Sequence, residues 1–169
     1  FSEDLIEMQS ILGTKISGKD LKFLINDNIV KGKNLTILDS ENNQYFLEDG
    51  IIDLNKDEFI GKDIEINFEN SLFGNKENDP RFVGKALNTN KKQTNIYKGV
   101  FTTCKKRDDE ECPAWAIYAD EIEHQKEKQI INYKNAWLKI YDVPVIYFPK
   151  FYHPDPTVKR QSGFLFPMI

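Results

Sequence analysis

The sequence has little of what enzymes and metal proteins commonly use. Its 169 residues include only two cysteines and two histidines. His124 and His153 lie far apart, and because no His-x-His pair occurs, a cupin-type metal site has no support. Gly-x-Ser-x-Gly, glycine-rich phosphate loops and Cys-x-x-Cys are also absent. We therefore expect no enzyme activity, catalytic residue, metal or cofactor, and we interpret His124 as a solvated strand end and His153 as a turn residue.

Two further absences narrow the class of protein. No apolar run reaches the roughly 18 residues of a membrane helix, and a net charge of -4 gives no electrostatic footprint for nucleic acid. A disordered chain is excluded, because hydrophobic residues make up 40% of the sequence and aromatic residues 12%. The length suits one domain with its own core.

The sequence is rich in short alternating stretches. Apolar and polar residues alternate over residues 64–68, as in a half-buried strand, and residues 21–25, 35–37, 115–119 and 136–140 do the same. Polar clusters that favour turns separate them, at residues 26–28, 39–43, 47–50, 74–80 and 88–95. The pattern predicts an all-β fold: an antiparallel sandwich, a jelly roll or an open barrel. A helix is expected only at the N-terminus, where Leu5, Met8, Ile11 and Leu12 have helical spacing.

A faint internal repeat accompanies the strands. GKDLKF begins at Gly18, GKNLTI at Gly32, GKDIEI at Gly61 and ADEIEH at Ala119. Each unit would be one strand plus its turn, which predicts a ladder that stacks the same element. Ordinary turn chemistry ahead of a strand is the alternative.

The last third of the chain resembles a known family. The pieces that carry the resemblance are Thr103-Cys104 followed by Trp115, Asn135-Ala136 ahead of a strand, VPVIYFP at residues 143–149, and above all HPDPTVKRQSGFLFP at residues 153–167. They resemble the periplasmic domain of the LptD family of LPS-assembly proteins, the OstA (organic solvent tolerance) family. Residues 18–87 match only the general OstA-like strand pattern.

The resemblance implies a domain division. Residues 1–17 are an N-terminal segment, and residues 18–152 form a periplasmic OstA-like incomplete β-jelly roll of antiparallel strands. Residues 153–169 are the linker and the start of the first strand of an outer-membrane barrel, and the barrel itself is absent from this chain. Pro154 and Pro156 would be a stiff joint to the barrel, with Lys159 and Arg160 near the membrane surface.

The function implied is LPS transport in Gram-negative bacteria, at the periplasmic side of the outer membrane. In the family, LPS arrives from a periplasmic LptA-like bridge protein and passes through the jelly roll to the barrel, which the lipoprotein LptE plugs. The expected partners are therefore LPS, the bridge protein, LptE and the barrel of the same parent chain, without nucleic acid.

Alternating inward residues would line an apolar groove for the acyl chains, because each methylene left in water costs about 0.8 kcal/mol. The candidates are Phe23, Ile37, Ile66, Phe68, Ile117, Leu138 and Ile140. Plain core packing is the alternative for each of them. Two other functions stay open: a carbohydrate-binding jelly roll that uses Trp115 and Trp137, and an LptA-like bridge component.

The two cysteines lie eight positions apart across a charged stretch. If Cys104 ends one strand and Cys112 begins the next, they lie within bridging distance, and a disulfide would indicate an oxidising compartment. Two free thiols are the alternative. The family resemblance adds a third possibility, because family members commonly join the cysteine after the paired threonines to the distant barrel.

Overall fold

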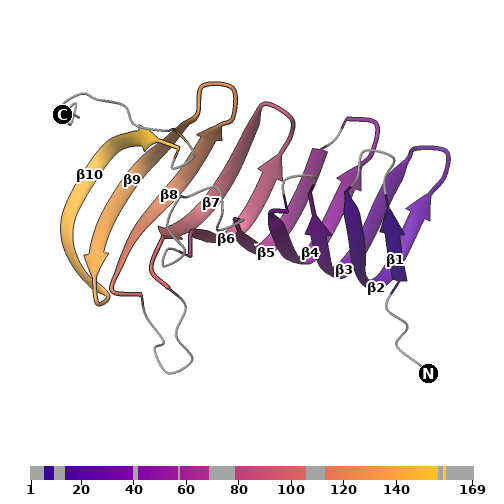
Figure 1. Cartoon of the computed structure of the whole chain (residues 1–169), viewed down its shortest axis with the longest axis horizontal. Coiled ribbons are helices and arrows are strands. Elements are labelled where there is room, and N and C mark those ends of the chain that lie inside the picture. Colours follow the sequence, from indigo (N-terminus) through magenta and orange to yellow (C-terminus); the bar gives the residue numbers. More distant parts are fainter. Residues whose placement is uncertain are drawn as a thin grey trace.

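The chain forms a single antiparallel sheet in a computed structural model that describes residues 6–9, 14–39, 42–56, 58–68, 79–105, 113–155 and 158. Ten strands follow one another in sequence order, with β1 and β10 at opposite ends of the molecule (Figure 1). They are β1 (Ile6–Gln9), β2 (Lys15–Leu24), β3 (Ile29–Leu38), β4 (Gln44–Asp53), β5 (Glu58–Asn67), β6 (Arg81–Thr89), β7 (Gln93–Thr102), β8 (Trp115–Gln125), β9 (Ile130–Ile140) and β10 (Val143–Pro154). Within the described ranges there is no helix that is long and apolar enough to cross a membrane.

In the described part of the chain each strand pairs only with the strands before and after it. The prediction of an all-β antiparallel fold is therefore confirmed, and the open sheet is consistent with an incomplete jelly roll. The N-terminal helix is wrong at residues 6–9, where β1 pairs with β2. A short apolar stretch does not distinguish a helix from a strand by spacing, and β2 offers a hydrogen-bonding edge.

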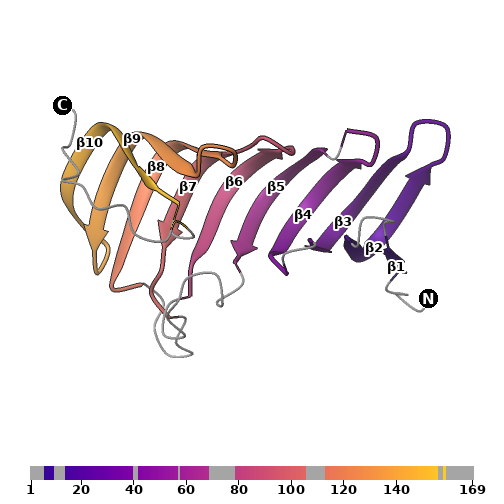
Figure 2. The ribbon, with the colours of Figure 1, turned by 45° about the horizontal axis from the view of Figure 1, so that its top comes forward.

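The strands are bent rather than straight (Figure 2). Along β2–β9 buried and exposed residues alternate, except at mid-strand, where two successive residues face outward before the alternation resumes. The sheet therefore folds into two arms whose inner faces share one core. We call them the Ile37 arm (residues 15–18, 35–38, 44–47, 64–67, 81–84, 99–102, 115–119, 136–140 and 143–148) and the Val30 arm (residues 21–24, 29–32, 50–53, 58–61, 87–89, 93–96, 122–125, 130–133 and 151–154).

At the bend every strand from β2 to β9 places one large and one small residue inward. On β3, β4 and β5 the large residue lies on the Ile37 arm: Leu35 with Gly32, Leu47 with Gly50, and Ile64 with Gly61. On β2 and β6–β9 the small residue lies on the Ile37 arm: Gly18 with Leu21, Gly84 with Leu87, Gly99 with Ile96, Ala119 with Ile122, and Ala136 with Tyr133. The glycines make room for aliphatic side chains, since a Cβ on Gly99 would lie 2.6 Å from Cδ1 of Ile122.

This bend explains the internal repeat. Gly18, Gly32, Gly61 and Ala119 are each the inward residue just before the two outward ones. Asp20, Asn34 and Asp63 have positive φ angles of 53°, 47° and 42°, a backbone region that Asp and Asn tolerate better than most residues. The repeat is therefore a stacked structural unit, but its motif lies at mid-strand rather than in a turn ahead of a strand. The turn predicted at residues 47–50 is wrong for the same reason, because they lie inside β4.

Candidate functional site

The inner face of the Ile37 arm carries an unbroken row of apolar side chains that crosses all of its strands. Cross-strand pairing places Ile37, Ile66, Ile117 and Leu138 in this row. We call it the Ile37 row; in strand order it consists of Ile16, Ile37, Tyr45, Ile66, Phe82, Phe101, Ile117, Leu138 and Ile146. Four of the seven predicted groove residues thus share one register, while Tyr45, Phe82 and Phe101 were missed because their flanking residues do not alternate cleanly.

The other three groove candidates also point inward by strand alternation, but near the strand ends. Phe68 follows β5 and its ring lies 5.5 Å from that of Phe82. Ile140 ends β9 and is 44% exposed. Phe23 lies near the tip of the Val30 arm, opposite Val30, and is 41% exposed.

Burial along the Ile37 row loosens towards β10. Ile37 and Ile66 are almost fully buried, Ile117 and Leu138 are half-buried, and Ile146 is 46% exposed. The row is therefore part of the packed core over β3–β7 and accessible at the β10 end.

Aromatic rings from the two arms meet across the fold. Tyr45 on the Ile37 arm lies edge-on to Phe59 on the Val30 arm, with ring centroids 6.0 Å apart. Nearer β10, the rings of Phe101 and His153 are tilted by 32° to each other, with their centroids 5.6 Å apart. Side chains fill the space between the arms at these two places. An apolar ligand can therefore enter there only if the arms move apart.

A polar cluster lies inside the Val30 arm at the β10 end. Nε2 of His124 lies 2.5 Å from Oδ2 of Asp155, and Nε2 of His153 lies 2.8 Å from the Tyr133 hydroxyl. Burial lowers the pKa of His153, and burial together with the Asp155 charge raises the pKa of Tyr133. The interpretation of His124 as a solvated strand end and of His153 as a turn residue is wrong, because both residues lie within strands and face inward. His124 lies opposite Thr94 and Ile131, and His153 lies opposite Ile131.

These groups do not form a metal site. In the described ranges no three His, Cys, Asp or Glu side chains are placed to hold a metal ion. The cluster instead fastens the end of β10 to the β8–β9 hairpin, since the Asp155 N–H also donates to the Gln129 carbonyl at 2.7 Å.

Known proteins match part of this chain. No family model matches it. It is 36% identical over 81 residues to the LPS-assembly protein LptD of Yersinia pseudotuberculosis, which is 48% of this chain and 10% of that protein. It is 39% identical over 74 residues to the LptD proteins of Xanthomonas axonopodis pv. citri and Sodalis glossinidius, 44% of this chain and 8% and 9% of theirs. The chain contains an LptD-related region. It spans about a tenth of the length of these curated relatives.

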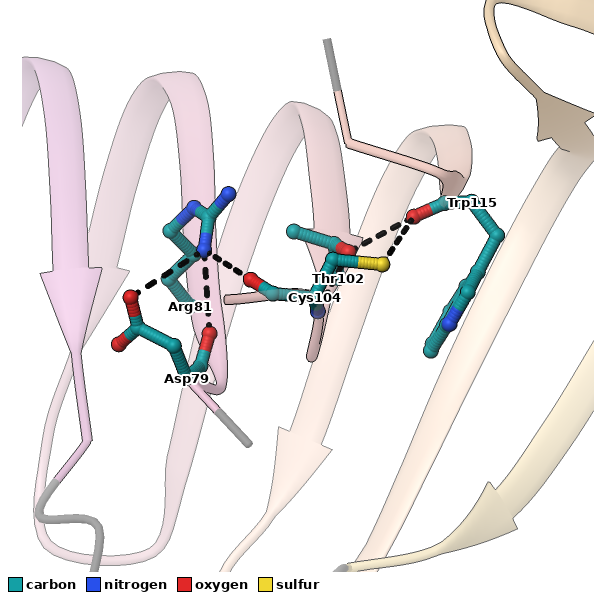
Figure 3. Close-up of polar contacts among 5 residues, drawn as sticks. All are labelled: Asp79, Arg81, Thr102, Cys104 and Trp115. Carbon is teal, nitrogen blue, oxygen red and sulfur yellow. Dashed lines mark hydrogen bonds and ion pairs between the residues drawn. The ribbon is translucent and has the colours of Figure 1, made fainter. Parts of the chain in front are cut away.

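Cys104 is held beside the start of β8 (Figure 3). Its Sγ lies 3.7 Å from the carbonyl oxygen of Trp115, to which the Thr102 hydroxyl also donates at 2.7 Å. On the other side the Arg81 guanidinium donates to the Cys104 carbonyl at 2.5 Å and to that of Asp79 at 3.2 Å. The thiol is half-buried. Cys112 lies outside the described residues, so the Cys104–Cys112 disulfide stays a prediction.

The predicted joint is described only in part. Pro154 is the last residue of β10 and lies opposite Ile130, so His153 and Pro154 extend the sheet. Pro156, Lys159 and Arg160 lie outside the described residues.

The two tryptophans point to opposite faces of the sheet. Trp115 packs against the core beside Phe101, whereas Trp137 is 44% exposed beside Tyr147 on the outer face. They therefore do not form a single platform for a carbohydrate ring.

Proposed function

We propose that this domain takes part in LPS assembly on the periplasmic side of the outer membrane. It would receive LPS from an LptA-like bridge protein at the β1 end and pass the acyl chains along the Ile37 row. A barrel of the same parent chain, with LptE, would take them at the β10 end, where Pro154 and Pro156 stiffen the connection. This role is transport and needs no catalytic residue.

The Ile37 row is the observation that carries the proposal. Once the two arms separate over β3–β7, its uninterrupted apolar side chains offer a path on which acyl methylenes avoid water, each worth about 0.8 kcal/mol. The rise in exposure from Ile66, at 1%, to Ile146, at 46%, provides an open end next to the last strand. The likeness to LPS-assembly proteins supports a lipid as the guest.

A photo-crosslinking residue at Leu138, tested in the parent protein in cells, checks this function. Leu138 faces inward and is half-buried, while its neighbour Trp137 faces outward and is 44% exposed. We expect LPS adducts from position 138 and none from position 137. Because access alone favours the more exposed position, equal labelling or stronger labelling at 137 would contradict transport along the inner face.

A further inference from the structure

The outer face of the Val30 arm has a depression of about 820 Å³ that spans β2–β5. It lies on the opposite side of the sheet from the Ile37 row. Four lysines line it: Lys22, Lys31, Lys33 and Lys62. They stand out in a chain whose net charge is -4.

Two pairs of lysines lie in directly opposed positions on β2 and β3. Lys22 lies directly opposite Lys31, and Lys33 lies directly opposite Lys19 on the same pair of strands. Like charges in directly opposed positions on neighbouring strands destabilise a sheet. A bound anion would relieve this repulsion.

Carboxylates offset the charge only in part. Asp20 and Asp49 are the acidic residues of the lining, and Asp49 lies opposite both Lys33 and Lys62. The hydrogen bond from Lys85, 2.7 Å away, is the main cause of the lowered pKa of Asp63, and the Lys62 charge adds to it, but that carboxylate is already paired with Lys85. Among the described residues none of the four lysines forms an ion pair, whereas Lys56, Lys85 and Lys134 do.

Two exposed isoleucines lie in the same depression. Ile51 and Ile60 face each other across β4 and β5 and are 41% and 49% exposed. Apolar side chains among lysines suit a ligand that is anionic at one end and apolar at the other. The volume is within the roughly 300–1,000 Å³ of small-molecule sites.

We propose that this outer depression binds a phosphorylated amphiphile. Lysine ammonium groups are common phosphate partners, and Lys22 and Lys31, which lie directly opposite each other, are placed to contact the same phosphate. Ile51 and Ile60 then cover the first methylenes of the attached chain. Such a site is separate from the Ile37 row and does not depend on the function proposed for that row.

Three probes distinguish the sources of binding in a calorimetric titration of the whole chain. Monododecyl phosphate, kept below its micelle concentration, should bind with an affinity that falls as salt rises. Inorganic phosphate should bind at least tenfold more weakly, and zwitterionic dodecylphosphocholine should not bind at this site. Equal binding of dodecylphosphocholine, or of inorganic phosphate, would overturn the proposal.

Variants then assign the binding to these lysines. The double variant Lys22→Gln/Lys31→Gln should lose at least tenfold in affinity for monododecyl phosphate. The matched control Lys56→Gln/Lys134→Gln removes two ion-paired lysines and should leave that affinity unchanged. Lys22→Gln/Lys31→Gln should also unfold at a higher temperature without ligand, because the opposed charges are gone. Retained affinity, or a lower melting temperature that accounts for the loss, would overturn the assignment.

Discussion

Strands β3–β5 and strands β6–β9 differ in which arm carries the large inward side chain at the bend. In β3–β5 the Ile37 arm supplies the large side chain and the Val30 arm a glycine, as in Leu47 and Gly50. In β6–β9 the Val30 arm supplies the large side chain, as in Ile122, against Ala119. Every strand keeps one large residue and one small residue at the bend, but the arm that provides the large residue changes. Interiors packed to crystal-like density require this complementarity.

The two regions also differ at the tip of the Val30 arm. In β3–β5 the inward-facing row nearest the strand ends is apolar and consists of Val30, Ile52 and Phe59. From β6 onwards Thr89, Thr94 and His124 continue the same row. Only the Ile37 arm is apolar from end to end, which is why we assign the acyl path to it.

The largest effect is expected from Ile122→Ala, which removes a fully buried side chain from the β6–β9 region. It should lower the free energy of unfolding by about 2–5 kcal/mol through lost burial and a cavity. Gly99→Ala should cost about 1–3 kcal/mol alone, because its methyl overlaps with Ile122. The double variant should be less unstable than the sum by about 0.5–3 kcal/mol, measured by chemical denaturation.

The equivalent cycle in the other region uses Leu47→Ala and Gly61→Ala, because a Cβ on Gly61 would meet the Leu47 side chain. It should show the same favourable coupling with the arms exchanged. A mixed pair, Ile122→Ala with Gly61→Ala, is the control and should be additive. Coupling of the mixed pair as strong as that of the matched pairs would rule out local complementarity.

The bend also decides what could be predicted from the sequence. Ile64, Ile66 and Phe68 were correctly placed on one face because alternation holds within an arm. It breaks at Lys62-Asp63, where both residues face outward, so each strand was predicted at about half its length. The residues that make the bend, Gly, Asp and Asn, are those that also make turns. A single sequence does not separate the two uses.

The polar interior near β10 could not be predicted for another reason. Neither His124 nor His153 is part of a motif, and their inward orientation follows from register across three strands. His124 lies opposite Thr94 and Ile131, and Ile131 lies opposite His153. The continuity of the Ile37 row is likewise a property of register, which connects residues that are up to 130 positions apart in the chain (146 − 16).

A smaller effect is expected on pH dependence, which should come from the β6–β10 region. Burial lowers the pKa of His153, which faces Tyr133, His124 and Asp155. The unfolded chain then binds a proton that the folded chain does not, so stability is full above the ordinary histidine pKa of about 6.5 and is lost as pH falls below it. One proton contributes at most about 1.4 kcal/mol per pH unit. His153→Gln should reduce the loss of stability between pH 7 and pH 5, measured by denaturant titration at each pH. An unchanged slope in this variant would show that His153 is not the group responsible.

The smallest effect is expected at the bend of β7. There the second outward-facing residue has a positive φ angle but is neither Asp nor Asn. The left-handed residue is Asp20, Asn34, Asp63 or Asn135 in four other bends, but Lys98 in β7, with φ of 48°. Left-handed backbone costs an ordinary L-residue about 1–2 kcal/mol, and Asn less, so Lys98→Asn should stabilise the chain by about 0.5–1 kcal/mol. Asn34→Lys should cost a similar amount, and Lys150→Asn, at an exposed bend position without positive φ, should give no gain. Thermal unfolding of the three variants side by side is sufficient. If Lys98→Asn and Lys150→Asn shift the melting temperature equally, the backbone conformation is not what selects Asp and Asn at these bends.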